Sequence, residues 1–287
     1  MTPRELLKKT TIRFREAGVP DPETDSAQLL SHLTGRAPLM LRLDSDTRLP
    51  DFVVDGFEEL CAERESGVPL QHILGTARFY GRDFHTDARA LIPRPETELL
   101  IELAVKHCRE NHMICPSILD LCTGSGCIGI TMQLMLPGAS VTMTDISQDA
   151  ADLARRNVLR YDAPVRLLTG DLFEPVSGMR FDLILSNPPY IPTGICETLQ
   201  REVRDHEPRI ALDGGEDGLF FYRRIANEAP GHLKHGGMLM LEIGYDQAQS
   251  VGELLENAGF TDILIWRDMN GLDRVVTGRA AEVDDVR

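Results

Sequence analysis

Segments with the pattern of buried strands alternate with amphipathic segments between residues 117 and 258. Strands are predicted at 117–122, 140–145, 165–169, 181–186 and 237–243, and helices at about 126–136, 147–161, 217–231 and 246–258. This alternation is typical of a parallel sheet with helices on both faces. Two more strands, at 261–268 and 272–278, flank the turn signal Asn270-Gly271 and predict an antiparallel hairpin. We therefore expect an α/β fold with a doubly wound, mostly parallel sheet of seven strands and an antiparallel hairpin at one edge.

The first part of the chain has a different pattern. Helical spacing at 2–18, 22–34 and 50–65 predicts a small helical domain over residues 1–72, in which we find no catalytic constellation. Residues 73–92, beginning with Ile73-Leu74-Gly75, alternate in the manner of short strands with glycine turns and predict a β-hairpin linker. The domain that contains the sheet is expected to cover 93–287, opening with a helix from Pro95 to about Arg109.

Composition excludes several classes of protein. The chain has 30 Lys and Arg against 45 Asp and Glu, a net charge of −15, which disfavours non-specific binding to nucleic acid or to an acidic membrane. No apolar run approaches the ~20 residues of a membrane span, and no signal peptide is evident. The six cysteines form no Cys-x-x-Cys pair and accompany no histidine cluster. We therefore expect no metal site, and reduced, buried thiols in a cytoplasmic protein. A monomer is the default expectation, since no feature of the sequence indicates an oligomer.

A glycine-rich loop follows the first strand of the predicted sheet. Gly124, Gly126 and Gly129 fit the pattern G-x-G-x-x-G between a strand and a helix. In that pattern the first glycine allows a sharp turn, the second lets a ligand approach the backbone, and the third lets the helix pack closely on the sheet. Asp145 ends the next strand, where a carboxylate can accept from both hydroxyls of a ribose. Together these features indicate a nucleoside cofactor.

Two further acids bear on which cofactor binds. Asp120 lies within the strand just before the loop and fits a sulfonium amino-acid cofactor better than a nicotinamide dinucleotide. Such a cofactor has no pyrophosphate, and its amino group needs an acceptor. Asp171 follows the third strand and can accept from an adenine NH2 group, with Leu172 packing beside the ring. The alternative for Asp171 is a turn or helix cap.

The tetrapeptide Asn187-Pro188-Pro189-Tyr190 directly follows the fourth strand. The Asn187 side chain offers a carbonyl acceptor, and the prolines hold the loop stiff and present carbonyl groups without N–H donors. Tyr190 adds a flat wall with a polar tip. The loop suits a planar NH2 group held by both hydrogens, but a proline-rich turn with no ligand fits the tetrapeptide equally well.

These residues resemble the class I S-adenosylmethionine-dependent methyltransferases that act on amide and amine nitrogens. Within that class, four features resemble the protein-(glutamine-N5) methyltransferases that modify peptide chain release factors. They are the helical N-terminal region, Gln71-His72-Ile73-Leu74-Gly75, Leu91-Ile92-Pro93-Arg94-Pro95-Glu96-Thr97-Glu98 and Leu241-Glu242-Ile243-Gly244. The resemblance covers nearly the whole chain. It implies S-adenosylmethionine as cofactor, the Gly-Gly-Gln glutamine of class 1 release factors as substrate, and the N-terminal domain as a substrate-recognition module.

The resemblance also implies a set of site residues. The cofactor-binding residues would be Asp120, Cys122, Thr123, Gly124, Ser125, Gly126, Asp145, Ile146, Asp171, Leu172 and Asn187. The catalytic residues would be Asn187, Pro188 and Tyr190, and the substrate-binding residues Asn187, Pro188, Pro189, Tyr190, Arg94 and Glu96. One position departs from the family, which usually has glycine where this chain has Cys122. On the residues alone, Arg94, Glu96 and Glu98 also fit a helix start with solvated charges.

Three other functions remain to be weighed. An adenine-N6 nucleic-acid methyltransferase shares the Asn-Pro-Pro-Tyr motif, but the net charge and the absence of a Lys/Arg cluster disfavour it. A non-enzymatic cofactor-binding protein could have the same fold. A nicotinamide dehydrogenase is the most distant alternative.

Overall fold

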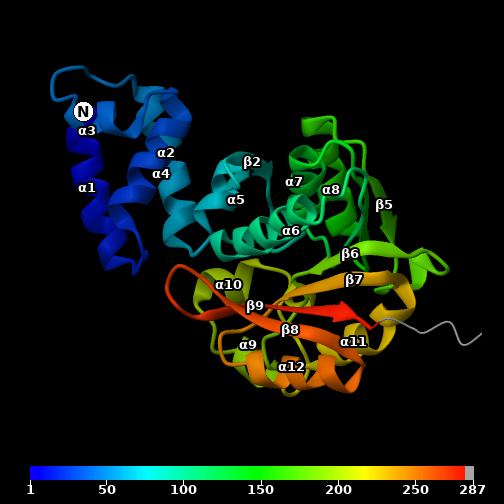
Figure 1. Ribbon diagram of the computed structural model, residues 1–287. Coiled ribbons are helices and arrows are strands. Elements are labelled where there is room, and N and C mark those ends of the chain that lie inside the picture. Colours follow the sequence, from blue (N-terminus) through cyan, green and yellow to red (C-terminus); the bar gives the residue numbers. More distant parts are fainter. Residues whose placement is uncertain (282–287) are drawn as a thin grey trace, which may run out of the picture. The chain divides into compact units, whose positions relative to one another are not determined.

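The computed structural model describes residues 1–281, and these form two compact units (Figure 1). The first, which we call the helical unit, consists of Met1–Thr76 together with Gln200–His206. The second, the sheet unit, consists of Ala77–Leu199 together with residues 207–281. A short segment from the second half of the chain, Gln200–His206, therefore belongs to the same unit as the N-terminal helices.

The helical unit contains six helices around an apolar core. They are α1 (Pro3–Glu16), α2 (Pro22–Thr34), α3 (Pro38–Leu43), α4 (Asp51–Glu65), α5 (Leu70–Leu74) and α10 (Arg201–His206). The predicted start of α1 is confirmed, because Thr2 and Glu5 form a reciprocal capping box. The predicted end of α2 is also confirmed, since Gly35 adopts the left-handed conformation with φ of 67°.

A buried arginine connects three of these helices. The Arg64 side chain on α4 is only 3% exposed. Its Nε donates to Asp25 Oδ2 on α2 at 2.7 Å, and its Nη2 donates to Glu202 Oε1 on α10 at 2.6 Å. Its Nη1 donates to the Val68 carbonyl at 3.0 Å. The guanidinium thus makes the charge-assisted hydrogen bonds that a buried charge requires, and α10 supplies one of them.

The predicted linker is partly wrong. Residues 73–75 do not start a strand, because Leu70–Leu74 form the helix α5, which Gly75 ends in the left-handed conformation. An apolar run this short does not distinguish a helix from a strand by its spacing. The hairpin itself is confirmed and consists of β1 (Thr76–Phe79) and β2 (Arg82–His85).

The large sheet has seven strands, as predicted. They are β3 (Ser117–Leu121), β4 (Ser140–Asp145), β5 (Arg166–Thr169), β6 (Phe181–Ser186), β7 (Leu233–Glu242), β8 (Phe260–Arg267) and β9 (Asp273–Ala280). Their order is β5-β4-β3-β6-β7-β9-β8. Strands β5, β4, β3, β6 and β7 pair in parallel, whereas β9 pairs antiparallel with β7 and with β8. The predicted mostly parallel sheet with an antiparallel edge hairpin is confirmed.

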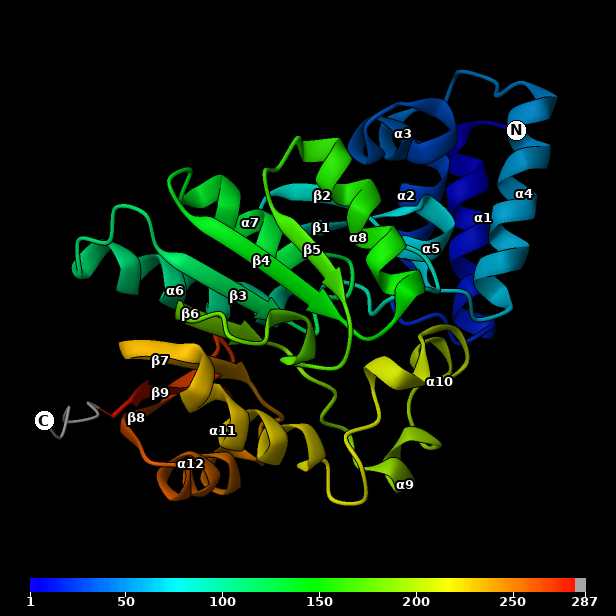
Figure 2. The same ribbon diagram turned by 90° about the vertical axis from the view of Figure 1, so that its right-hand side faces the viewer.

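Helices cover both faces of this sheet (Figure 2). One face carries α6 (Glu98–Glu110), α7 (Cys127–Met135) and α8 (Gln148–Tyr161), and the other carries α11 (Phe220–His232) and α12 (Ala248–Asn257). Alternate residues of β3 face opposite layers, with Ile118 in the first core and Leu119 and Leu121 in the second. Shorter elements complete the unit: α9 (Thr193–Cys196), η1 (Pro95–Thr97), η2 (Glu174–Val176) and η3 (Arg209–Ala211).

The strand order fixes where a ligand can bind. The chain leaves β3 toward β4 and β5 on one side and returns through β6 and β7 on the other. Open sheets of this kind bind ligands at the carboxyl ends of the two strands where the order reverses. Here these strands are β3 and β6, which are followed by the glycine-rich loop and by the Asn187 tetrapeptide. Among residues 1–281, no helix is both long and apolar enough to span a membrane.

The expectation for the cysteines is only partly right. All six are free, but Cys115, in the loop before β3, is exposed and Cys122 is only partly buried, whereas the other four are buried.

Candidate active site

The glycine loop has the geometry that its sequence predicts. Gly124 and Gly126 have φ of 55° and 82°, a region that side chains rarely adopt. A Cβ on Gly129 would lie 2.5 Å from the Met143 sulfur, so only glycine allows α7 to pack this closely on β4. The predicted roles of Gly124 in the turn and of Gly129 in packing are confirmed.

Asp120 lies under this loop and does not line the cavity described below. Its Oδ2 accepts from the Thr123 hydroxyl at 2.5 Å and from the Gly129 N–H at 2.8 Å. Its Oδ1 is buried and has no partner among residues 1–281. Burial raises the pKa of this carboxyl to about 7, although both hydrogen bonds oppose the rise. The structure therefore gives Asp120 a part in holding the loop, and its direct contact with a cofactor stays a prediction.

Two non-glycine residues, one directly after β3 and one shortly after β5, have a left-handed backbone conformation. They are Cys122 with φ of 58° and Leu172 with φ of 44°, and both line the cavity. Such conformations are concentrated at functional sites. Burial, followed by the charge of Asp145, raises the pKa of the Cys122 thiol. A thiol with a raised pKa is a poor nucleophile, which disfavours covalent catalysis by Cys122.

Asp145 lines the cavity at the end of β4. Its Oδ2 accepts from the Gly124 N–H at 2.8 Å and its Oδ1 from the Ser147 N–H at 2.9 Å. A carboxylate has about four acceptor positions, so two remain for a ligand. The neighbouring Ile146 also lines the cavity and is 53% exposed. This arrangement suits a diol beside an apolar group.

Asp171 also lines the cavity, but it has a partner that sequence reasoning missed. Both of its oxygens lie 3.0 Å from the guanidinium of Arg224 on α11, and this guanidinium lies 5.8 Å from the centre of the Phe220 ring. Arg224 and Phe220 line the cavity as well. The Asp171 carboxylate accepts from Arg224, as a carboxylate does from a guanidinium.

In the tetrapeptide, Asn187 lines the cavity and its Nδ2 donates to Thr97 Oγ1 at 3.3 Å. No residue from 1 to 281 donates to its Oδ1 or to the Pro188 carbonyl. Two acceptors at the end of β6 are therefore free. Pro189 lines the cavity, whereas Pro188 is buried outside the lining.

Tyr190 does not line the cavity but packs against the core beneath α11 and α12. Burial raises the pKa of its hydroxyl to about 12. Gln247 Nε2 donates to the Tyr190 carbonyl at 3.0 Å and fixes the backbone there. Gly218 is required beside it, because a Cβ at that position would lie 2.4 Å from the same carbonyl oxygen.

Of the two charged residues predicted to bind substrate, only Arg94 lines the cavity. Its guanidinium forms an ion pair with Glu207, and the Glu207 carboxylate also accepts from the Ile92 N–H at 3.2 Å. This contact holds the start of the segment 207–213 beside residues 92–94. Glu96 is half-buried and lies outside the lining.

One cavity of about 250 Å³ collects most of the predicted residues. Those that line it are Arg94, Cys122, Thr123, Gly124, Ser125, Asp145, Ile146, Asp171, Leu172, Asn187 and Pro189. Those that do not are Asp120, Gly126, Glu96, Pro188 and Tyr190. Sequence reasoning missed three groups of lining residues: Arg89, Ala90, Leu91, Ile92, Pro93 and Thr97; Pro208, Ile210, Ala211, Phe220, Phe221 and Arg224; and Cys127, Ile128, Thr144, Ser147, Ala150 and Gly170. The first group lies in or directly before the segment Leu91–Glu98. The resemblance of that segment to the family could have indicated these residues.

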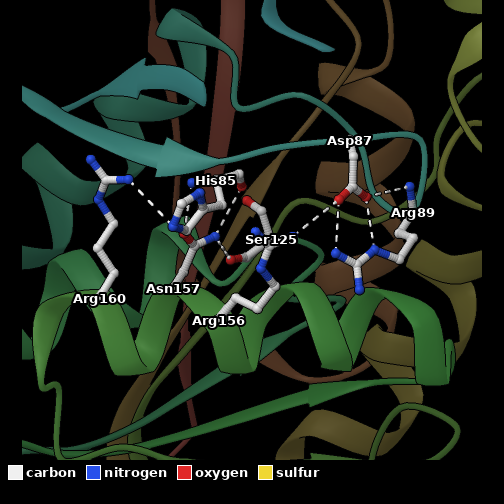
Figure 3. Close-up of polar contacts among 7 residues, drawn as sticks. All are labelled: His85, Asp87, Arg89, Ser125, Arg156, Asn157 and Arg160. Carbon is white, nitrogen blue, oxygen red and sulfur yellow. Dashed lines mark hydrogen bonds and ion pairs between the residues drawn. The ribbon is translucent and has the colours of Figure 1, made fainter. Parts of the chain in front are cut away.

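The hairpin β1–β2 is tied to the glycine loop by one buried amide, Asn157 on α8 (Figure 3). Its Nδ2 donates to the carbonyls of His85 (3.0 Å) and Ser125 (2.9 Å), and its Oδ1 accepts from the His85 N–H at 2.7 Å. Beside it, Asp87 and Arg89 form a bidentate ion pair. Asn157 therefore fixes the loop and the start of the segment that leads to Arg94.

The cavity fits an adenosyl cofactor with an amino-acid arm. Ser125 lines the cavity, and its hydroxyl oxygen is buried and has no partner within residues 1–281. A Cβ built on Gly124 would meet only Ala90, at 3.8 Å, so the backbone there is open to a close ligand. Acceptors at Asp145 and Asp171, 26 residues apart in sequence, are available for a ribose and an adenine amine.

Two family models match the chain: the PrmC N-terminal domain at residues 5–75 and the Methyltransferase small domain at 96–201. The Release factor glutamine methyltransferase of Geobacter sulfurreducens is 44% identical over 278 residues, which cover 97% of this chain and 96% of the relative. That of Chlorobaculum tepidum is 43% identical over 279 residues, covering 94% of each.

Among solved structures, a methyltransferase from Pyrococcus furiosus has a TM-score of 0.52 at 20% identity and covers 71% of this chain and 91% of that one. This likeness concerns the fold alone. The two relatives, by contrast, are similar over nearly their whole length, which confirms the resemblance expected from the motifs. The chain belongs to the family of release factor glutamine methyltransferases.

Proposed function

We propose that this chain transfers the methyl group of S-adenosylmethionine to the side-chain amide nitrogen (N5) of the glutamine in the Gly-Gly-Gln segment of class 1 release factors. The observation that carries the proposal is the pair of free acceptors, Asn187 Oδ1 and the Pro188 carbonyl, at the end of β6. Asn187 lines a cavity whose other wall is the glycine loop, and Pro188 is the next residue in the chain. Membership of the family supports the same activity.

The residues that would hold the cofactor are those of the cavity. Asp145 would accept from the ribose hydroxyls and Asp171 from the adenine amine, with Ile146 and Leu172 on either side of the ring. The loop residues from Cys122 to Gly126 would carry the amino-acid arm. When bound, S-adenosylmethionine supplies an electrophilic methyl group on a sulfonium sulfur.

The protein's task is to orient a poor nucleophile. The lone pair of an amide nitrogen is delocalised into its carbonyl group, so the nitrogen must be held against the methyl carbon. Asn187 Oδ1 and the Pro188 carbonyl would each accept one amide hydrogen, an orientation effect worth up to about 7–11 kcal/mol. The same acceptors stabilise the positive charge that grows on nitrogen in the transition state.

The transfer balances without a further reactant. The nitrogen–carbon bond forms as the carbon–sulfur bond breaks, and the electron pair of that bond stays on sulfur. One amide proton then leaves to solvent, so no strong base is required.

The helical unit would contribute a docking surface for the release factor. This extends the expected role of residues 1–72 as a substrate-recognition domain, in a monomeric, cytoplasmic enzyme. Replacing that domain with the same region of an unrelated helical protein should reduce methylation of the intact factor. Unchanged methylation would refute this role.

The test is methyl transfer from radiolabelled S-adenosylmethionine to a purified class 1 release factor. Parallel acceptors are the same factor with its Gly-Gly-Gln glutamine changed to alanine, and duplex DNA. Label on the intact factor alone is expected, and Asn187→Ala should cut turnover by far more than cofactor affinity. Label on DNA would favour the adenine-N6 activity, and equal label on the alanine variant would overturn the substrate.

A further inference from the structure

Arg224 lies in the first half of α11 and lines the cavity, yet no step of the proposed reaction uses it. Its guanidinium makes two parallel contacts with one carboxylate. Nη1 donates to Asp171 Oδ1 at 3.0 Å, and Nη2 lies 3.0 Å from Asp171 Oδ2. Such a pair fixes the plane of a carboxylate as well as its position. Among residues 1–281, Arg224 is the one residue that binds this side chain.

The Arg224 side chain is itself held by residues of its own helix. Phe220 and Glu228 lie one turn before and one turn after it on α11, so the three side chains share one face of the helix. The guanidinium carbon lies 5.8 Å from the centre of the Phe220 ring, within the range of a cation–π contact. Arg224 Nε lies 3.7 Å from Glu228 Oε1. The guanidinium is therefore in place before a ligand binds.

The backbone next to Asp171 is also fixed. The Gly170 N–H donates to the carbonyl of Asp145 at 2.9 Å, which ties this loop to the predicted acceptor for the ribose. The Glu174 N–H donates to the Asp171 carbonyl at 3.0 Å. These bonds restrain the main chain but not the carboxylate, which can still turn about the bonds of its side chain. The contact with Arg224 is what restrains the carboxylate.

The Asp171 carboxylate retains free acceptor positions. A carboxylate has about four such positions, and the guanidinium occupies one on each oxygen, so one on each oxygen remains. Asp171 lines the cavity together with the apolar side chains of Leu172 and Phe220. This combination suits a flat heterocycle that has a donating group at its edge, such as the NH2 group of adenine.

We infer that Arg224 is a positioning residue for base recognition, which holds the Asp171 carboxylate where it accepts from the 6-amino group of the cofactor's purine. This inference rests on the proposed function, which assigns that contact to Asp171. A purine without the amino group offers the carboxylate no hydrogen there, and the loss of one hydrogen bond to a charged group corresponds to about 10–100-fold in affinity. The preference for adenine should therefore depend on Arg224.

The test compares two ligands that differ only in this amino group. They are S-adenosylhomocysteine, which is the cofactor after methyl transfer, and its 6-deamino analogue, in which hydrogen replaces the NH2 group of the base. Calorimetric titration gives both dissociation constants without a release factor and without methyl transfer. Wild-type protein should bind S-adenosylhomocysteine about 10–100-fold more tightly than the analogue. Arg224→Gln should reduce this ratio to less than about threefold, by weakening S-adenosylhomocysteine and leaving the analogue nearly unchanged.

Arg223→Gln is the matched control. Arg223 is the neighbouring residue on α11 and also donates two hydrogen bonds to one carboxylate, that of Asp217, but it does not line the cavity. Its ratio should equal that of the wild type. Asp171→Ala should remove the preference for adenine, and adding Arg224→Gln to it should lower the ratio no further. Arg224→Lys keeps the charge without the planar fork, so its ratio should fall between those of the wild type and Arg224→Gln.

The outcomes separate this inference from the proposed function. Equal binding of the two ligands by the wild type overturns the inference, because the 6-amino group is then not recognised. So does an Arg224→Gln variant that loses affinity for both ligands by the same factor, as a purely structural role requires. Should Arg224→Gln fail to fold, an unchanged ratio in Arg224→Lys overturns the inference instead. A wild-type protein that shows the expected ratio but does not methylate the release-factor glutamine would refute the proposed reaction and not the role of Arg224.

Discussion

The buried carboxyl of Glu242 should leave a measurable signature in the pH dependence of stability. The pKa of this carboxyl is about 7 in the folded protein, against an ordinary value of 4.5 in the unfolded chain. The difference of about 2.5 units corresponds to about 3 kcal/mol, at ~1.36 kcal/mol per unit. Because the folded pKa is the higher one, the folded state binds more protons between pH 4.5 and 7. The contribution of Glu242 to the free energy of unfolding therefore falls as the pH rises through this range and is level above it.

The perturbation is Glu242→Gln, and the assay is urea unfolding of both proteins from pH 4.5 to 8. Charged groups near Glu242, namely Arg274 and Glu96, are present in both proteins, and their own titration cancels in the difference. The free energy of unfolding of the variant minus that of the wild type should increase by about 3 kcal/mol from pH 4.5 to pH 8.

Asp182→Asn gives a control of opposite sign. Burial raises the pKa of Asp182, but hydrogen bonds from Lys234 and Ser117 outweigh it and the net shift is downward. Asp182 therefore stabilises the fold above its unfolded pKa, and this contribution is lost as the pH falls. A Glu242→Gln difference that stays constant with pH, or that follows the Asp182→Asn trend, would refute the reasoning.

Three further changes test the packing described above, each by urea unfolding. Gly129→Ala should lower the free energy of unfolding by about 1–3 kcal/mol, because its Cβ would lie 2.5 Å from a side-chain sulfur on β4. Gly231→Ala is the control and should cause no loss, since its Cβ would meet nothing within 4 Å. Equal effects of the two changes would contradict the argument. Arg64→Met should lower the free energy of unfolding by about 3–5 kcal/mol, because Asp25 keeps a buried charge without its partner, and a loss under 1 kcal/mol would show that the pair is dispensable. Cys122→Gly should be about 1 kcal/mol more stable than Cys122→Ala, since only glycine adopts φ of 58° without strain, and the reverse order would exclude strain at this position.

Local patterns in the sequence predicted the sheet well. Strand β3 is a short apolar run followed by the glycines of the loop, and both signals depend on neighbouring residues only. The short helix α5 was missed because a segment of five residues is too short to show whether its apolar residues recur at the spacing of a helix or of a strand.

The site was predictable to the extent that its residues follow strand ends. Asp145 and Asn187 do so, and both line the cavity. Arg224 and the segment after Glu207 were not predictable, because they reach the cavity through ion pairs with Asp171 and Arg94, 53 and 113 residues away in sequence. Asp120 has the right residue type at a strand end, but the alternation of β3 turns it toward α7 and away from the cavity.

The position of Glu202 has a consequence for how the chain folds during its own synthesis. The helices around Arg64 leave the ribosome before the sheet unit does. Arg64 can bind Glu202 only after a further 138 residues have been synthesised. At ~5–20 residues per second, that delay lasts about 7–28 s. During this interval the guanidinium has Asp25 and the Val68 carbonyl but not its third contact. The helical unit is therefore the first to be synthesised but cannot be completed until most of the sheet unit has emerged.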